Sequence, residues 1–466
     1  LGKEKERDLS VLCIGPAGEN LVRFAGIFAD KGHSASQNGS GAVMGSKKLK
    51  AIAVARGKGP VPVDNRQALS AAAKRMFEAA KEQAKGYTYK YGTFWLFEAA
   101  RAAGQLPVKN WTSNVFPHLP EFDPEWLRSR FEVEYRPCWA CRMRHCHRSK
   151  ITEGPYAGLI VEEPEYAALA TWGPNMGNTD VGTTYMLNDT VDRLGMEGGQ
   201  SSYIISLLME CFEKGILTRE DTDGIEMAWG NAEAARAMLR KIANRDGFGD
   251  VLADGVMKAA QRIGGEAPNM AVHTMKGTTT AGSDLRYSWF RMLDACITNA
   301  GTKQSPDSRE VREAVAELGI PPITDSFSWE QVATFSAKTC GRVQFTDSLG
   351  VCKWNTAGLE STIDAVKACT GWDLTLPEAM EVGRRAANLL RAFDIRHGLI
   401  PEMEALSPRM GSAPADGPAK GKSIMPVIRE MRRKYYEEMG WDKETSKPLP
   451  ETLRNLDLEH VIADIW

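Results

Sequence analysis

Three cysteines lie close together in the run Cys138-Trp-Ala-Cys141-Arg-Met-Arg-His-Cys146. A Cys-x2-Cys pair places two thiolates on one turn, and a third cysteine shortly after it can fold back onto the same ion or cluster. His145 and His147 flank the third cysteine. The spacing alone fits two chemistries equally well. One is a zinc ion with four cysteine and histidine ligands, and the other is an iron–sulfur cluster with a distant fourth cysteine.

Basic side chains crowd this run of cysteines. They are Arg136, Arg142, Arg144, Arg148 and Lys150. Their positive field would offset the negative charge of a cluster with thiolate ligands, which mildly favours iron–sulfur over zinc. A solvated basic loop would have the same composition.

Two other segments share the pattern Asp-x-x-Gly, then an apolar residue, then Glu or Cys. They are Asp192-Arg-Leu-Gly-Met-Glu197 and Asp347-Ser-Leu-Gly-Val-Cys352. A carboxylate beside a glycine turn can accept hydrogen bonds from the N–H groups of a ring ligand. Each segment alone is typical of an ordinary helix end. Two copies, one of which ends in a candidate fourth cysteine, indicate a cofactor site.

The elements that carry these residues are predicted to be mostly helical. Residues 8–60 predict a strand, a turn at 15–18, a helix over 19–29, a glycine-rich loop over 34–46 and a buried strand over 49–55. Asp64 and Gln67 are expected to cap a helix that ends near Lys85, and a capping box is expected at Thr375-Leu-Pro-Glu378. Further helices are expected at 186–194, 202–214, 232–243, 248–263, 329–340, 362–369 and 378–393, and a long surface loop at 407–422.

These patterns predict a mainly α fold with a small N-terminal α/β part and two helical domains. Pro60-Val-Pro62 and the segment near Gly264 break the chain. The expected divisions are 1–60, with the predicted strands; 61–267, with the cysteine run and the first Asp-x-x-Gly motif; and 268–466, with the second motif and Cys352.

Composition excludes several classes of protein. The 466 residues carry a net charge of −2, which gives no reason to expect a nucleic-acid or anionic-membrane partner. No apolar stretch approaches the roughly 20 residues of a membrane span. Nine cysteines are too few, and odd in number, for a disulfide scaffold. We expect a cytoplasmic, reducing location, with the scattered cysteines as small buried hydrophobes; these are Cys13, Cys211, Cys296, Cys340 and Cys369.

Over nearly its whole length the sequence resembles the tungsten- and molybdenum-containing aldehyde:ferredoxin oxidoreductase family. The resemblance rests on the cysteine run, both Asp-x-x-Gly motifs and four further segments, Ile14–Asn20, Gly41–Ile52, Glu163–Tyr166 and Asn388–Asp394. Family members usually carry additional β structure before the first of these segments. The resemblance therefore implies that residues 1–60 are the tail of a β-rich cofactor-binding domain. It also implies a chain that is incomplete at its N-terminus and that by itself could be inactive.

The resemblance implies a set of cofactors and residues. Two pyranopterins would bind one tungsten or molybdenum, and the resemblance also allows a magnesium ion. A [4Fe-4S] cluster would be held by Cys138, Cys141, Cys146 and Cys352. Asp192 and Asp347 would hydrogen-bond the pterins, with Met196, Glu197 and Val351 nearby. The loop from His33 to Gly41, with Ser34, Ser36 and Gln37, would lie against a pterin and its phosphate.

The resemblance also implies a reaction. Aldehydes would be oxidised to carboxylic acids, and electrons would leave through the cluster to ferredoxin or an electron-transfer subunit. Glu165 is the candidate catalytic carboxylate, expected to be desolvated and to act as a general base; a structural ion-pair role is its alternative. Arg142 and Arg144 are candidates for docking an acidic ferredoxin.

The sequence departs from the family at three places. The second gap of the cysteine run is one residue longer than usual, and Gln37 stands where an arginine is usual. Histidines that the family often has near the metal are absent from Gly282–Arg286 and Gly301–Gln304. Two alternatives therefore stay open. One is the catalytic subunit of an aromatic-acyl-CoA (benzoyl-CoA type) reductase within a homo- or hetero-oligomer, and the other is a non-catalytic helical protein stabilised by zinc or a cluster.

Overall fold

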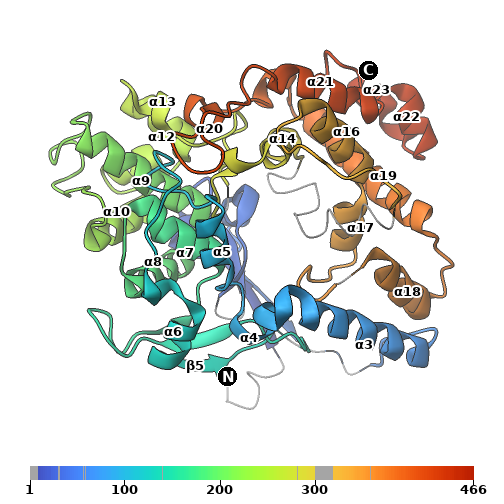
Figure 1. The fold of residues 1–466 in the computed structure, drawn as a ribbon, viewed down its shortest axis with the longest axis horizontal. Coiled ribbons are helices and arrows are strands. Elements are labelled where there is room, and N and C mark those ends of the chain that lie inside the picture. Colours follow the sequence, from blue (N-terminus) through green and yellow to red (C-terminus); the bar gives the residue numbers. More distant parts are fainter. Residues whose placement is uncertain are drawn as a thin grey trace.

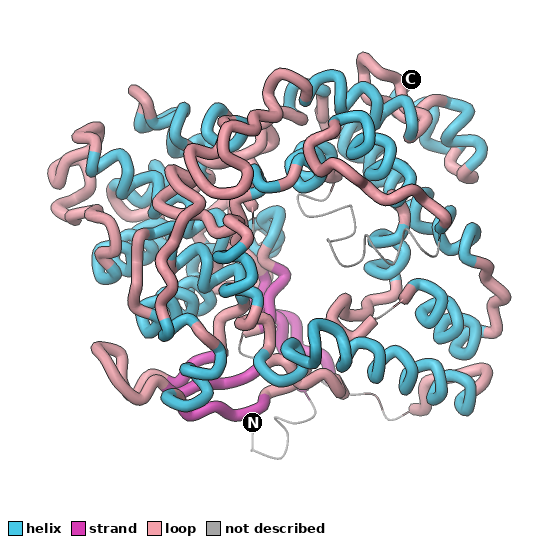
Figure 2. Tube along the Cα trace, in the orientation of Figure 1, coloured by secondary structure: helices cyan, strands magenta, loops and turns pink. Residues whose placement is uncertain are grey.

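The computed structural model describes residues 9–29, 32–55, 57, 59–138, 140–280, 282–299, 318–356 and 358–466. Helices dominate the described chain, and the strands gather in two small sheets (Figures 1 and 2). The prediction of a mainly α fold with a small N-terminal sheet is confirmed. The predicted division into three domains stays a prediction.

The N-terminal sheet has the strand order β3-β2-β1-β4, and all its pairs are antiparallel. Its strands are Leu9–Cys13 (β1), Ile27–Ala29 (β2), His33–Ala35 (β3) and Ala51–Ala55 (β4). The predicted strand over 49–55 therefore exists, but its expected burial is wrong. β4 lies at the edge of the sheet, and its side chains are exposed along its whole length.

The predicted helix over 19–29 is wrong. The helix α1 spans only Pro16–Glu19, and Leu21 has a left-handed φ of 56°. The apolar side chains that suggested a helix are buried by long-range pairing instead. Ala25 forms a β-bridge with Met196, and the carbonyl of Phe24 accepts a 2.9 Å hydrogen bond from the amide of Glu197.

The second sheet holds the cysteine run. It is antiparallel with the order β5-β6-β7, formed by Glu132–Tyr135, His147–Lys150 and Ile160–Glu162. β5 leads into the run, β6 begins directly after Cys146, and β7 leads into the Glu163–Tyr166 segment. Three short strands thus bring two candidate site segments together.

A large apolar core lies among the helices that follow. It is built around Tyr166–Trp172 (α7), Val181–Leu194 (α8), Gly198–Glu213 (α9) and Ala232–Asn244 (α10). The helix expected over 248–263 is divided into Phe248–Leu252 (α11) and Val256–Ile263 (α12). Between them Gly255 has a φ of 96°, which ends the first helix because side-chain-bearing residues rarely adopt it.

The other predicted helices are present. They are Arg66–Glu82 (α3), Trp329–Thr339 (α16), Leu359–Thr370 (α18) and Leu376–Arg396 (α19). The cap of α3 is Asn65, whose side chain accepts from the amide of Ala68, in place of the expected Asp64. The capping box at Thr375 and Glu378 is confirmed. α3 packs along α18, so early and late parts of the chain lie side by side (Figure 1).

The segment 407–422 is not simply the surface loop that its composition predicted. It begins with a short helix, Pro408–Gly411 (α20), in which Met410 is fully buried. Further on, Asp416 accepts hydrogen bonds from the side chain of Ser113 and the amide of Asn114, each at 2.6 Å. These long-range contacts bind the segment to the body of the protein.

The remaining helices complete the described chain. They are Ser40–Ser46 (α2), Tyr87–Tyr91 (α4), Leu96–Ala102 (α5), Pro124–Arg130 (α6), Ala267–Met270 (α13), Trp289–Ile297 (α14), Arg342–Ser348 (α17), Ile428–Glu438 (α21), Pro450–Asn455 (α22) and Ile462–Ile465 (α23). Among the described residues, no helix combines the length and apolar character needed to cross a membrane. All nine cysteines are free thiols. Of the scattered five, Cys211, Cys296 and Cys340 are buried as expected, whereas Cys13 and Cys369 are only partly buried.

Candidate metal and cofactor site

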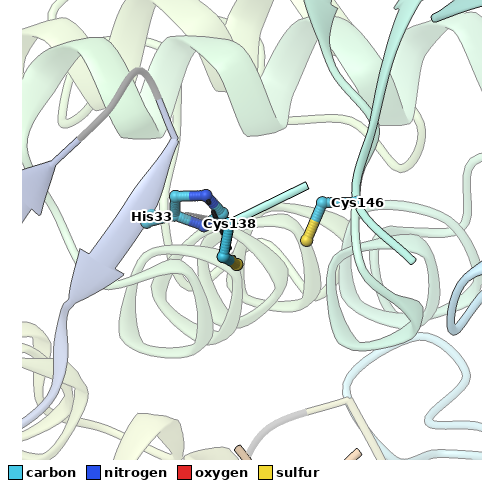
Figure 3. A group of neighbouring side chains, drawn as sticks. All are labelled: His33, Cys138 and Cys146. Carbon is cyan, nitrogen blue, oxygen red and sulfur yellow. Dashed lines mark hydrogen bonds between the residues drawn. The ribbon is translucent and has the colours of Figure 1, made fainter. Parts of the chain in front are cut away.

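The cysteine run folds into a compact loop. The amide of Cys141 donates to the carbonyl of Cys138, and the amide of Arg136 donates to the carbonyl of Cys146, both at 3.0 Å. Cys138 Sγ, Cys146 Sγ and His33 Nε2 all lie within 4.8 Å of one another (Figure 3). The longer second gap therefore does not keep the first and last cysteines of the run apart.

Cys352 comes from a distant part of the chain and lies near the run, but among the described residues neither Cys352 nor Cys141 joins the compact group of Cys138, Cys146 and His33. Burial raises the pKa of the Cys352 thiol, and the nearby thiolates of Cys141 and Cys138 raise it further. The ring of Trp354, two residues on, lies 6.4 Å from the ring of His145. Three local thiols and one distant thiol are the soft donors that an iron–sulfur cluster takes, and binding of a cluster would draw Cys141 and Cys352 toward the other two and displace the thiol protons.

A buried ion pair anchors the loop to its surroundings. The guanidinium of Arg128 donates to both carboxylate oxygens of Glu163, at 2.6 and 2.8 Å. Glu163 also lies 3.2 Å from Nδ1 of His147, the residue after Cys146. Burial alone would raise the pKa of Glu163, but hydrogen bonds from His147 and Arg128 hold it below its ordinary value. We call these three residues the Arg128 clamp, and they join β6 to the start of the Glu163–Tyr166 segment.

Glu165 lies beside the cysteine run but is not desolvated as expected. Its side chain is 53% exposed, at the N-terminal end of α7. Two neighbours orient its carboxylate. The hydroxyl of Thr93 donates to one oxygen, and His145 Nε2 lies 3.4 Å from the other. The catalytic role of Glu165 stays a prediction.

Two other carboxyls of this region, Glu162 and Asp192, are partly buried and have, among the residues described, no cationic partner as close as that of Glu163. Burial raises the pKa of Glu162 to about 7, with the charge of Glu165 adding to the shift. Burial likewise raises the pKa of Asp192 to about 8, with Glu162 and Asp189 contributing. Within the described part of the chain, the Asp192 carboxyl has one hydrogen bond, a 3.0 Å contact from Asn188. A buried carboxyl with unused hydrogen-bonding capacity fits the polar edge of a pterin.

The rest of the first Asp-x-x-Gly motif connects helices to the N-terminal sheet. Gly195 ends α8 with a φ of 78°, and a Cβ there would lie 2.6 Å from the amide nitrogen of Gly15. Met196 is 1% exposed. The carboxylate of Glu197 caps α9 by accepting from the amides of Gly199 and Gln200. Glu197 therefore has a structural role in addition to its predicted place near a cofactor.

The glycine-rich loop borders a polar cavity. Ser34 lies on β3, and Ser36 comes just before a single 3₁₀ turn, Gln37–Gly39. Gln37 and Glu197 line a cavity of about 370 Å³ whose wall also carries three cationic side chains, Arg23, Lys258 and Lys276. These cations fit the phosphate of a cofactor. Neither the described residues nor the comparisons below support the magnesium ion.

The second Asp-x-x-Gly motif lies in a more open environment. Asp347 is the next-to-last residue of α17 and is exposed, although partial burial of its carboxyl raises the pKa. Val351 is 40% exposed. In Gly282–Arg286, Asp284 and Arg286 form a buried ion pair at 2.5 Å. The stretch Gly301–Gln304 lies outside the described residues.

Sequence reasoning missed four residues of this site. They are Thr93, Arg128, His145 (noted only as a flank of Cys146) and Glu162. The three glutamates at 162, 163 and 165 form an acidic run that could have drawn attention to Glu162. Nothing in the local sequence marks Thr93 or Arg128, because each meets its partner only through the fold.

Comparisons with known proteins identify the family of this chain. Residues 1–56 match the family model "Aldehyde ferredoxin oxidoreductase, N-terminal domain", and residues 68–458 match "Aldehyde ferredoxin oxidoreductase, domains 2 & 3". A tungsten-containing aldehyde ferredoxin oxidoreductase of Pyrococcus furiosus is 31% identical over 96% of this chain and 73% of its own. The same organism has an aliphatic sulfonate oxidoreductase, WOR-like subunit, that is 28% identical over 97% of this chain and 70% of its own.

Solved structures share the fold as well. One is the active-site complex BamBC of benzoyl coenzyme A reductase with 1,5-dienoyl-CoA, with a TM-score of 0.79 at 21% identity over 97% of this chain and 74% of that one. Because the family models cover most of the sequence, the chain belongs to the aldehyde ferredoxin oxidoreductase family of oxidoreductases.

Proposed function

We propose that this protein oxidises aldehydes to carboxylic acids with a tungsten bis-pyranopterin and passes the electrons through a [4Fe-4S] cluster to ferredoxin. Relatives at 30 and 31% identity are tungsten-containing aldehyde ferredoxin oxidoreductases. The bound tungsten would take up two electrons per aldehyde, and the protein would supply ligands, orientation and exclusion of water. The observation that carries the proposal is the compact group of Cys138, Cys146 and His33, whose ligand atoms lie within 4.8 Å of one another beside the segment that holds Cys352 and Trp354.

The proposed cluster ligands are Cys138, Cys141, Cys146 and Cys352. Asp192 would hydrogen-bond one pterin, and its desolvation supports that role because a buried carboxyl needs a partner. Asp347 and Val351 would contact the second pterin. The first pterin and its phosphate would lie next to the cationic cavity. They would contact Met196, Glu197 and the loop that carries His33, Ser34, Ser36 and Gln37.

Glu165 is the proposed proton acceptor. Thr93 and His145 fix its two oxygens, and its exposure leaves it open to substrate or water. A carboxylate held in one orientation can take a proton from an attacking water or a hydrated aldehyde. Replacement by glutamine should lower kcat far more than it lowers metal content.

The exposed Arg142 and Arg144 are the proposed docking groups for ferredoxin. Arg142 lies over the ring of Phe77 at 4.1 Å, and Arg144 lies over that of Tyr135 at 4.9 Å. These stacked positions keep two positive charges next to the cluster ligands, where they would attract an acidic carrier. Reversal of both charges should weaken ferredoxin binding and flatten its salt dependence, and unchanged binding would contradict this assignment.

Reduction of an aromatic acyl-CoA within a larger complex is the second candidate. Gln37 in place of arginine and the absence of histidine from Gly282–Arg286 favour it, because a different substrate requires different polar groups. The proposal predicts that aldehydes reduce a viologen dye and that benzoyl-CoA does not oxidise the reduced dye. The reverse pattern would establish the second candidate, and turnover of aliphatic sulfonates alone would contradict both.

A further inference from the structure

His33 lies between a carboxylate and a cysteine of the proposed cluster. It is the first residue of β3, where it pairs with Ala29. Its Nε2 is 3.8 Å from Cys138 Sγ, and its Nδ1 is 3.8 Å from an oxygen of Glu162 (Figure 3 shows His33 and Cys138). The imidazole therefore spans the gap between the N-terminal sheet and the cysteine run.

The contacts of His33 with Cys138 and with Glu162 have the same distance but differ in kind. Sulfur is a large atom, and an N–H···S contact of 3.8 Å is within hydrogen-bonding range. Hydrogen bonds from N–H to oxygen are about 2.7–3.2 Å long, so the contact with Glu162 is only an electrostatic one. Of these two partners only the sulfur is within hydrogen-bonding range of the ring, so the tautomer with a proton on Nε2 directs that proton at Cys138.

Close backbone packing fixes this arrangement. A Cβ on Gly32 would lie 1.8 Å from a carboxylate oxygen of Glu162, so a larger residue before His33 would make the Glu162 carboxylate shift. The His33 and Glu162 side chains are 34% and 25% exposed, which shields their interaction from most solvent. The strand that carries His33 and the strand that ends with Glu162 thus hold the ring against the cysteine run.

We propose that His33 donates its Nε2–H to the Cys138 thiolate and thereby raises the reduction potential of the cluster. Reduction adds negative charge to a cluster, and hydrogen bonds to its sulfurs stabilise that charge. The inference rests on the proposed function, since it requires the cluster. It gives His33 a task in addition to the pterin contact proposed for its loop.

The test is a redox titration of the full chain, purified without oxygen and followed by electron paramagnetic resonance. In His33→Ala the potential should move to a more negative value while the iron content stays that of the wild type. His33→Gln should recover part of the shift, because its amide can still donate to sulfur. His118→Ala is the matched control. That ring is 49% exposed and lies 3.4 Å from Glu98, so its removal should leave the potential unchanged.

Each other outcome is decisive. A full cluster with an unchanged potential in His33→Ala would overturn the role of His33 and leave the proposed function intact. Loss of the cluster from a folded His33→Ala protein would show that His33 is needed to bind the cluster and does not merely tune it, which also overturns the inference. A wild-type protein without iron would contradict the proposed function itself. His33→Leu serves as a second non-donating variant if His33→Ala does not fold.

Discussion

Removal of the Arg128 guanidinium should loosen the strand that follows the cysteine run. In Arg128→Met, the carboxylate of Glu163 would lose both of its short hydrogen bonds, at 2.6 and 2.8 Å, while its side chain is only 5% exposed. Loss of one partner from a buried ion pair costs about 3–5 kcal/mol. Arg128 is itself 19% exposed, so we expect the lower end, about 3 kcal/mol.

Hydrogen exchange measures this local cost. At about 1.4 kcal/mol for each factor of ten, the amides of β6 should exchange roughly a hundredfold faster in Arg128→Met. The matched control is Arg193→Met. Its ion pair with Asp189 has the same 2.6 Å distance, but Arg193 is 69% exposed, so only about 0.3–0.5 kcal/mol should be lost. Equal acceleration in the two variants would refute the claim that the Arg128 clamp holds the loop.

The clamp also predicts a pH dependence. The pKa of Glu163 lies below its ordinary value in the folded protein. Its contribution to stability is therefore present at neutral pH and is lost as the pH falls through the folded-state pKa. The difference between wild type and Arg128→Met should shrink in acid, and a difference that grows there would contradict this sign.

Three further predictions concern the ligands, the core and the first Asp-x-x-Gly motif. Cys141→Ser should lose most of the cluster iron in metal analysis, whereas Cys13→Ser should keep it. Glu404→Gln should destabilise the protein by about 3–5 kcal/mol in urea unfolding, because it breaks a pair with Arg391 in which both side chains are fully buried. The difference in unfolding free energy between the wild type and Glu404→Gln should shrink in acid, because the pKa of Glu404 is lowered in the folded state. Gly195→Ala should cost at least about 1–2 kcal/mol in thermal unfolding, because the φ of 78° is unfavourable for alanine.

Local signals predicted much of the helical structure. The capping box of α19 was found because Thr375 and Glu378 act within one helical turn. The helix expected over 19–29 was wrong because Phe24 and Ala25 have helical spacing but contact residues from the first Asp-x-x-Gly motif. Sequence spacing cannot distinguish apolar residues buried by a helix from those buried by a distant partner.

The candidate site was predictable where chemistry is concentrated in the sequence. The cysteine run and Cys352 stand out because thiols rarely cluster without a function. The Arg128 clamp was not predictable, because Arg128 and Glu163 are 35 positions apart and look like ordinary surface charges. The exposure of Glu165 and the desolvation of Glu162 likewise depend on how β7 and α7 pack.

Metal analysis of the anaerobically purified protein, together with its visible spectrum, tests the central claim most directly. The proposed function predicts tungsten or molybdenum with about four irons per chain, and the brown colour of an iron–sulfur cluster. Zinc alone in a colourless protein would contradict it and would support a zinc-stabilised helical protein in its place.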